Sequence, residues 1–264
     1  MFNRVSVRFG GCVLAAALAL APLAAQAAVV NFGLQQFDRS ALAQAQKTRS
    51  DALTGYKLKN VTAETFETEK AWDGTSGTSN PKNTRVGSFS AITDMGPGTG
   101  QSVINGGSGL EVRSDNGMAW GRYNADGDSG LISGNWIDSN DNHGMRWDVD
   151  TGSKFNALSF FLIDAADVGG KFSMKVGDTL YSAILGAGGR LANGNIQLVT
   201  ILLDKAVSSL TVEMFHDRTN DGFGIDGATA MRIAPVPVPP AAALILSGLA
   251  ALGFLRRRRG AATA

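Results

Sequence analysis

Two apolar stretches decide the fold: FNALSFFLI at Phe155–Ile163 and IQLVTILL at Ile196–Leu203. Both faces of these stretches are apolar, which is typical of central strands or of strands covered on both sides. By contrast, KFSMKV at Lys171–Val176 and LTVEM at Leu210–Met214 alternate between apolar and polar residues. Alternation with a period of two indicates strands with one buried face. Together the four segments predict a protein built from β-strands.

Turn signals occur at short intervals along the chain, as at Asn105-Gly106 and Asn193-Gly194. The sequence shows neither a regular alternation of strands and helices nor a repeat of fixed period. We therefore expect an all-β fold, a single antiparallel β-sandwich with jelly-roll-like topology, over residues 60–233. Residues 28–59 are expected to form a separate N-terminal segment, in which SALAQAQKTRSDAL (40–53) favours one short amphipathic helix.

The composition suits a loop-rich β protein, with 33 glycines and only 8% aromatic residues. Six of the 24 basic residues lie near the ends, at Arg4, Arg8 and 256–259, which leaves 18 basic residues against 23 acidic ones in the body. An acidic body argues against nucleic acid as a partner, because phosphate binding needs a basic face. The single cysteine, Cys12, lies in the N-terminal segment, so the expected mature protein has no thiol.

The N-terminus has the three parts of a secretory signal peptide. Arg4 and Arg8 precede an apolar stretch at 12–23, and Ala25-Gln26-Ala27 follows it. This order of basic region, apolar region and small-residue cleavage site predicts export with cleavage after Ala27, so that residues 1–27 are removed. A membrane anchor is the alternative, but the apolar run is short for a bilayer core of about 30 Å.

The C-terminus holds a second apolar segment at 241–255, followed by Arg256, Arg257, Arg258 and Arg259. As a helix this segment would be about 22 Å long at 1.5 Å per residue, which is marginal for a permanent anchor. Proline inside a helix costs hydrogen bonds, so the helix is expected to begin at or just after Pro240. The positive-inside bias would keep the arginines in the cytoplasm and leave the body outside the inner membrane.

A proline motif that begins Val-Pro, an apolar helix rich in Ala, Leu and Gly, and a terminal arginine cluster together resemble a PEP-CTERM sorting signal, here at 234–264. In that family an integral-membrane exosortase of Gram-negative bacteria recognises the tail. The resemblance implies insertion into the inner membrane and cleavage within the motif Val236, Pro237, Val238 and Pro239. Val238 stands where the family usually has Glu, which leaves open which exosortase variant would act. An ordinary C-terminal membrane anchor is the alternative.

The same resemblance implies delivery to the cell envelope or to extracellular polysaccharide, as in biofilm formation. The partners it implies are the secretion translocon, the exosortase, the inner membrane and exopolysaccharide. Two other functions compete with this one: a Ca²⁺-dependent carbohydrate-binding module on a plain anchor, and an envelope polysaccharide hydrolase. We do not expect an enzyme, because His143 and His216 are the only histidines of the body and because the sequence lacks G-x-S-x-G, HExxH and Walker motifs.

Three Gly-rich loops contain clusters of Asp and Asn: NADGDSG at 124–130, DSNDNHG at 138–144 and DRTNDGFGID at 217–226. Ca²⁺ takes carboxylate and amide oxygens as ligands, although none of the loops fits an EF-hand. Asx turns explain the same residues without a metal. The stretch NDGFGID is also similar to the last strand of β-sandwich domains carried by PEP-CTERM proteins. The candidate ligands for a structural Ca²⁺ are Asp221 and Asp226 in the third loop, and Asp138 and Asn140 in the second.

Trp120, Trp136 and Trp147 lie in the same Gly-rich part of the chain as the first two loops. An exposed aromatic ring can stack on the face of a sugar, so the three residues form a candidate sugar-binding platform. The alternative is that they belong to the core, where large aromatic side chains of a sandwich are usually found.

Overall fold

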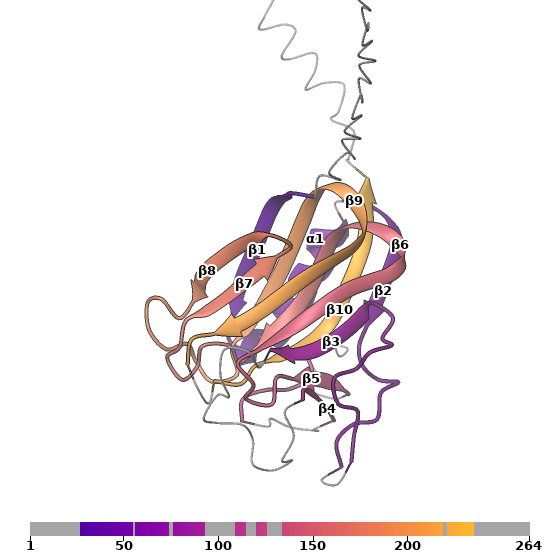
Figure 1. Ribbon diagram of the computed structural model, residues 1–264. Coiled ribbons are helices and arrows are strands. Elements are labelled where there is room, and N and C mark those ends of the chain that lie inside the picture. Colours follow the sequence, from indigo (N-terminus) through magenta and orange to yellow (C-terminus); the bar gives the residue numbers. More distant parts are fainter. Residues whose placement is uncertain are drawn as a thin grey trace, which may run out of the picture.

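The structure is a computed structural model that describes residues 27–54, 56–73, 76–92, 109–114, 120–125, 134–218 and 221–234. The expected signal peptide up to residue 26, the proline motif, the C-terminal apolar segment and the four arginines lie outside these described residues. Most of the described chain is antiparallel β-sheet, which confirms the all-β class (Figure 1). No helix within the described ranges has both the length and the apolar character needed to cross a membrane.

Ten strands and one α-helix make up the described chain. The predicted helix at 40–53 is confirmed as η1 (Arg39–Ala41) followed by α1 (Leu42–Thr54). The strands are β1 (Val29–Phe37), β2 (Lys57–Glu64), β3 (Gly87–Ile92), β4 (Glu111–Arg113), β5 (Trp136–Asp138), β6 (Gly144–Ile163), β7 (Phe172–Val176), β8 (Thr179–Leu185), β9 (Ile196–His216) and β10 (Gly224–Ala234).

Two long strands, β6 and β9, join the sheet into two layers. Their pairing is interrupted between Asp150 and Ala157 of β6, where both strands turn from one layer into the other (Figure 1). In the first layer the strand order is β1, β9, β6, β10 and β2. β9 contributes its first half to this layer and β6 its second half. In the second layer the order is β8, β7, β9, β6 and β3.

The main core lies between the two layers. It contains Phe172, Met174 and Val176, the inward residues of β7, as their alternation predicted. The indole of Trp147 in the second layer meets the ring of Phe160 in the first layer, with ring centroids 5.9 Å apart. Burial of large apolar side chains from both layers is the main driving force for this arrangement.

A second, smaller core covers the outer face of the first layer. Leu42 and Ala45 of α1 pack there with Phe161 and Ile163 of β6 and with Ile196 and Leu198 of β9. Successive residues of a strand point to opposite faces, so Leu158, Phe160 and Leu162 of FNALSFFLI enter the main core while Phe161 and Ile163 enter the smaller one. The stretch is apolar on both faces because the first layer is covered on both sides.

The sheet begins well before residue 60, which corrects the expected boundary of the β domain. β1 pairs antiparallel with β9, and β2 pairs antiparallel with β10. Both strands lie at edges of the first layer, and most of their residues are only half-buried or exposed. Their hydrophobic alternation is therefore weak, which is why the sequence assigned 28–59 to a separate segment.

Both ends of the described chain leave the sheet on the same side of the molecule, where β6 and β9 turn between layers (Figure 1). Ala28 exchanges hydrogen bonds with Asp204 in the turn of β9. Near the other end, Ile233 exchanges two hydrogen bonds with the Asn156 side chain in the turn of β6. The loops with the candidate site residues lie at the opposite end, next to β4 and β5.

Candidate functional site

The three acidic loops meet at this opposite end and hold one another in place. The Asp226 carboxylate of the third loop accepts a hydrogen bond of 2.8 Å from the Ala125 amide of the first. The Ser139 hydroxyl of the second loop accepts one of 2.9 Å from the Phe223 amide of the third. The sequence predicted each loop alone, and the structure brings described parts of all three together.

Asp138 and Asn140 bind protein groups that hold this end of the molecule together, which argues against their predicted role as calcium ligands. The Asp138 carboxylate is fully buried, with one oxygen 2.7 Å from Arg113 Nε and the other 3.3 Å from Arg122. Burial raises the pKa of Asp138, while the two guanidinium groups oppose that rise. The Asn140 amide group donates to Gly109 and to Glu111. Both side chains are thus already engaged by protein partners.

Asp226 is also engaged by the backbone. One of its oxygens accepts from Ala125, and the other accepts from the amide of the following residue, Gly227, at 2.7 Å. Gly227 has a φ of 59°, a left-handed conformation that favours glycine, and the turn lies within β10. The Asp226 carboxylate therefore stabilises a bulge and a loop contact, and its oxygens do not point toward a shared ligand position.

Asp221 differs from the other candidates because no nearby donor meets its carboxylate with good geometry. Its side chain is buried, and within the described part of the chain neither carboxylate oxygen has a partner with good hydrogen-bond geometry. Burial is the main cause that raises its pKa to about 7, and the Asp167 charge adds to it. The amides of Gly170 and Ala166 lie close enough to oppose this rise in the pKa.

Two further acids accompany Asp221. The Asp167 carboxyl group lies within hydrogen-bond reach of Asp221, and burial raises the pKa of Asp167. Burial also raises the pKa of Asp164 to about 8, despite a hydrogen bond of 2.6 Å that Asp164 accepts from the Gly194 amide. These two acids follow β6 directly, in the stretch DAAD, where no composition signal singled them out.

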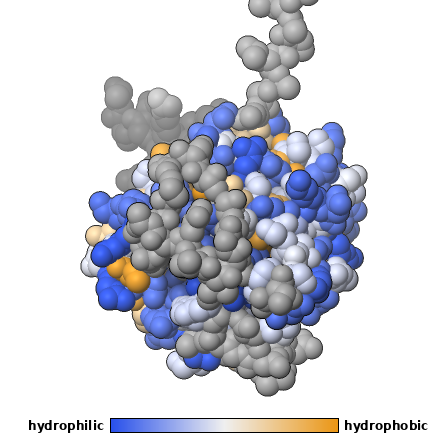
Figure 2. All heavy atoms as spheres, turned by 60° about the horizontal axis from the view of Figure 1, so that its bottom comes forward, coloured by the Kyte–Doolittle hydropathy of each residue, from blue (hydrophilic) through white to orange (hydrophobic). Residues whose placement is uncertain are grey.

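A pocket of about 320 Å³ opens at this end, and Trp120 stands at it with 58% of its surface exposed. The guanidinium carbons of Arg113 and Arg122 lie 5.1 and 5.6 Å from the indole ring centre, a distance at which cation–π attraction stabilises the ring. Figure 2 looks toward this end, and the described residues visible there are mostly hydrophilic. The pocket is lined by Arg113, Trp120, Arg122, Asn140, Asp141, Asp164, Asp167, Val168, Asn193 and Gly222.

Trp136 and Trp147 are fully buried, so the predicted sugar platform is wrong for both of them. Trp136 packs against the backbone of Gly224, where a Cβ atom would come 2.9 Å from the indole ring. The Trp147 Nε1–H group donates to the Val86 carbonyl oxygen at 3.1 Å, and the ring stacks on Phe89. Burial leaves Trp120 as the one member of the predicted platform that a ligand can reach.

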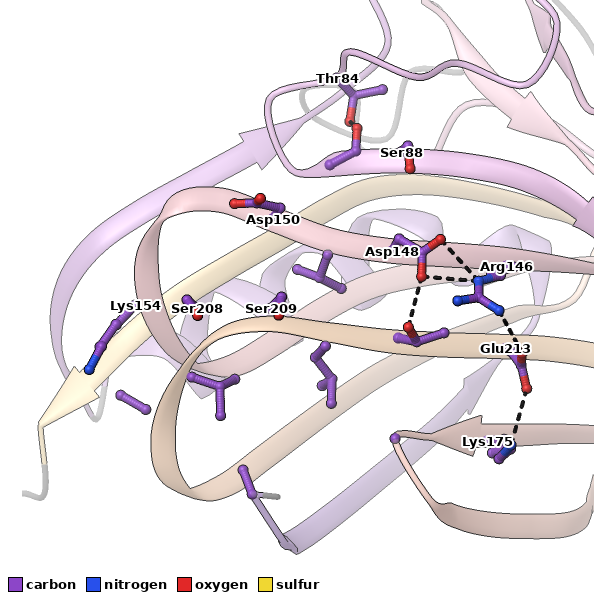
Figure 3. Close-up of a pocket in the computed structure, with 18 of the residues that line it drawn as sticks. Thr84, Ser88, Arg146, Asp148, Asp150, Lys154, Lys175, Ser208, Ser209 and Glu213 are labelled. Atoms are coloured by element: carbon purple, nitrogen blue, oxygen red, sulfur yellow. Dashed lines mark hydrogen bonds and ion pairs between the residues drawn. The ribbon is translucent and has the colours of Figure 1, made fainter. Parts of the chain in front are cut away.

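A larger hollow of about 1180 Å³ lies on the outer face of the second layer (Figure 3). Outward side chains pair along β6 and across to β9: Arg146 binds Asp148 of its own strand through Nε at 3.0 Å and reaches Glu213 of β9 at 3.5 Å. Lys175 lies 3.6 Å from Glu213 on the other side. None of the described residues that line this hollow is aromatic, and its central charges are paired. The pocket at Trp120 is therefore the better candidate site.

His216 is buried next to this end and stays neutral. Its Nε2 atom lies 3.1 Å from the Asn142 carbonyl oxygen, which it can approach only as a donor. Burial lowers the pKa of His216 to about 4, so the ring is neutral at physiological pH. Among the described side chains, no group of three His, Cys, Asp or Glu residues is already arranged around a common metal position.

Comparison of the chain with protein-family models, with curated proteins and with solved structures finds no match. The geometry of this end of the molecule and the sequences of the two termini are therefore the guides to function.

Proposed function

We propose that this protein is exported from a Gram-negative cell, sorted through its C-terminal tail by an exosortase, and binds carbohydrate of the envelope or extracellular matrix at the Trp120 pocket. The tripartite N-terminus supports export. The resemblance of 234–264 to a PEP-CTERM signal supports sorting, with the inner membrane as a transient or lasting attachment. In this proposal the protein is not an enzyme.

We interpret the body as a jelly-roll-like β-sandwich. If β6 and β9 are each counted as two strands, one layer contains β2, β10, β6 and β9, and the other contains β6, β9, β7 and β8. Two layers of four strands are the composition of a jelly roll. β1 and β3 then extend the two layers at their edges.

The position of the C-terminal end of the described chain supports a pocket that faces away from the membrane. The described chain ends at Ala234, on the side opposite to the pocket (Figure 1). β10 runs between these two sides over 11 residues, a length of about 35 Å in an extended strand. A membrane-bound tail that follows Ala234 would hold the sandwich with its Trp120 pocket facing away from the membrane.

The observation that carries carbohydrate binding is the exposed indole of Trp120 beside a polar pocket. A sugar ring presents C–H groups on its faces and hydroxyl groups at its edge, so it is bound by an aromatic face with polar groups around it. Asp167, Asn193 and Arg122 line this pocket and carry hydrogen-bond acceptors and donors. A volume of about 320 Å³ suits one or two sugar units.

Retention on polysaccharide tests the binding. Mature protein recovered from the envelope should be retained on exopolysaccharide of its own cell, and Trp120→Ala should abolish retention. Leu180→Ala is the matched control, because Leu180 is equally exposed, at 54%, on β8 away from the pocket. Equal retention of the Trp120→Ala and wild-type proteins would refute the site. Shortening of the polysaccharide chains during the incubation would indicate the hydrolase instead.

Mass spectrometry of the mature C-terminus tests the sorting. Exosortase processing predicts a terminus within Val236–Pro240 and loss of the arginine cluster. An intact RRRRGAATA end would show a plain membrane anchor. Neither result depends on whether the pocket binds carbohydrate, so the two parts of the proposal are tested separately.

A further inference from the structure

We propose that Asp164, Asp167 and Asp221 bind a divalent cation, Ca²⁺ by its chemistry, next to the Trp120 pocket. Only Asp221 was a candidate from the sequence. The other two carboxylates come from the turn that follows β6, more than fifty residues earlier in the chain. The proposal does not rest on carbohydrate binding, because it concerns the carboxylates alone.

The Asp221 carboxylate is buried without the hydrogen bonds that usually accompany burial. The residue is only 1% exposed, and neither of its carboxylate oxygens has a well-formed hydrogen bond within the described part of the chain. Buried carboxylates are normally paired, hydrogen-bonded or bound to a metal, because an isolated buried charge is strongly unfavourable. The amides of Gly170 and Ala166 and the Asp167 carboxyl group lie near Asp221, but none of them gives its carboxylate the well-formed hydrogen bond that a buried carboxylate normally has.

The carboxyl groups of Asp221 and Asp167 contact each other. Two carboxyl groups within hydrogen-bond reach cannot both be ionised at low cost, so the pair must hold either a proton or a cation. Outside the cell, where free Ca²⁺ is abundant, the cation competes with the proton. The ionised oxygens of such a pair are the hard ligands that Ca²⁺ prefers.

Further side-chain oxygens converge near the carboxylates, at Gly121. A Cβ atom at Gly121 would collide with the side-chain oxygens of both Asp164 and Asn193, so these oxygens converge on the backbone at that point. Gly121 has a φ of 98°, which favours glycine and permits this close approach. Ca²⁺ takes six to eight oxygens in flexible geometry, and carboxylate, amide and water oxygens would complete its shell.

The nearby cations do not replace a metal. Arg122 pairs with Asp138 and Asp141, so its guanidinium is shared with other acids. Arg190 donates to the backbone oxygen of Asp167 and lowers the pKa of its carboxyl group less than burial raises it. Because the three carboxylates do not yet meet at ligand distance, cation binding must draw Asp164 toward the Asp167 and Asp221 pair.

Calorimetric titration of the mature protein with CaCl₂, without any sugar, tests the site. We expect binding in the range of extracellular calcium modules, a dissociation constant of about 0.1–1 mM, with weaker binding of Mg²⁺. The melting temperature should rise with added Ca²⁺. Binding at pH 6.5 should release protons, which is measured by repeating the titration in buffers of different ionisation enthalpy.

Asp221→Asn should weaken Ca²⁺ binding at least tenfold and lower the number of protons released per bound ion. Asp178→Asn, a change at an exposed acid in the turn after β7, should leave both unchanged. If Asp221→Asn fails to fold, Asp167→Asn, at a less buried member of the pair, provides the same test. The absence of heat and of a thermal shift at 10 mM Ca²⁺ would overturn the proposal, as would unchanged Ca²⁺ binding in the folded variants. Loss of polysaccharide retention alone would not bear on it.

Discussion

The indole ring of Trp147 and the ring of Phe160 meet edge to face across the core, although both residues belong to the same strand, β6. A straight strand would separate them by about 40 Å, at 3.3 Å per residue. The contact exists because β6 turns between the two layers, so that its halves face one another. β9 turns beside it, and together the two strands bring both layers around one core.

The burial of Trp147 predicts a large loss of stability when its ring is removed. Trp147→Ala deletes contacts with Phe89 and Phe160 and leaves a cavity, so the free energy of unfolding should fall by about 3–5 kcal/mol. Trp120→Ala should change it by less than about 1 kcal/mol, because the ring is largely exposed. Urea unfolding measures both. Equal losses would contradict the assignment of one tryptophan to the core and the other to the pocket.

The sequence predicted the elements whose side chains decide their own environment. Phe155–Ile163 and Phe172–Val176 carry strong patterns, because their burial follows from the packing of apolar side chains on one or both faces. β1 and β2 were missed because edge strands obtain much of their stability from the neighbouring strand's hydrogen bonds. A hydrogen-bond partner on a strand that is distant in the sequence leaves no periodic trace in the strand itself.

The site was predicted less well, because its geometry depends on contacts between distant residues. The pairing of Asp138 with Arg113 and Arg122 requires three segments to meet, and only the acidic residue had a recognisable pattern. Asp164 and Asp167 follow a buried strand without any motif. The exposure of Trp120 and the burial of Trp136 likewise follow from the topology and not from local composition.

The buried ion-pair network predicts that Asp138→Asn is strongly destabilising. The change removes the buried carboxylate that Arg113 and Arg122 share and leaves them only their partners Glu111 and Asp141, so the free energy of unfolding should fall by about 3–5 kcal/mol. Asp148→Asn is the matched control on the surface, where Asp148 pairs with the half-exposed Arg146, and it should cost about 0–1 kcal/mol. Chemical denaturation of both variants measures the difference. A loss below about 1 kcal/mol for Asp138→Asn would refute the network's role.

The attachment of α1 depends on Arg49. Its NH2 group donates at 2.6 Å to the Gly227 carbonyl oxygen and at 2.6 Å to the Thr229 hydroxyl, and its guanidinium lies over the Phe161 ring. Arg49→Met keeps the apolar stem but leaves these acceptors without this donor, so we expect a loss of about 2–3 kcal/mol in the free energy of unfolding. Amide hydrogen exchange should show faster exchange in α1 than in β6. Unchanged exchange in α1 would contradict this role.

The raised pKa values of Asp164, about 8, and Asp221, about 7, predict that the protein loses stability as the pH rises. Both groups hold a proton more tightly in the folded than in the unfolded chain, where their pKa is about 3.9. Their contribution is therefore complete below pH 4 and is lost as the pH rises through 7 and 8. His216 acts in the opposite sense, because its pKa is lowered to about 4, and its contribution falls as the pH drops below 6.5.

The interval from pH 6.5 to 8.5 therefore covers the titration of Asp164 and Asp221 in the folded chain and lies above the range in which His216 lowers stability. In EDTA, which removes any bound divalent cation, the free energy of unfolding should fall across this interval by up to about 1.4 kcal/mol per pH unit for each group. The double variant Asp164→Asn, Asp221→Asn should have a nearly flat profile, because its amides do not ionise. Urea unfolding at four or five pH values gives the slopes. A slope that persists in the double variant would assign the titration to other groups and refute the raised pKa values.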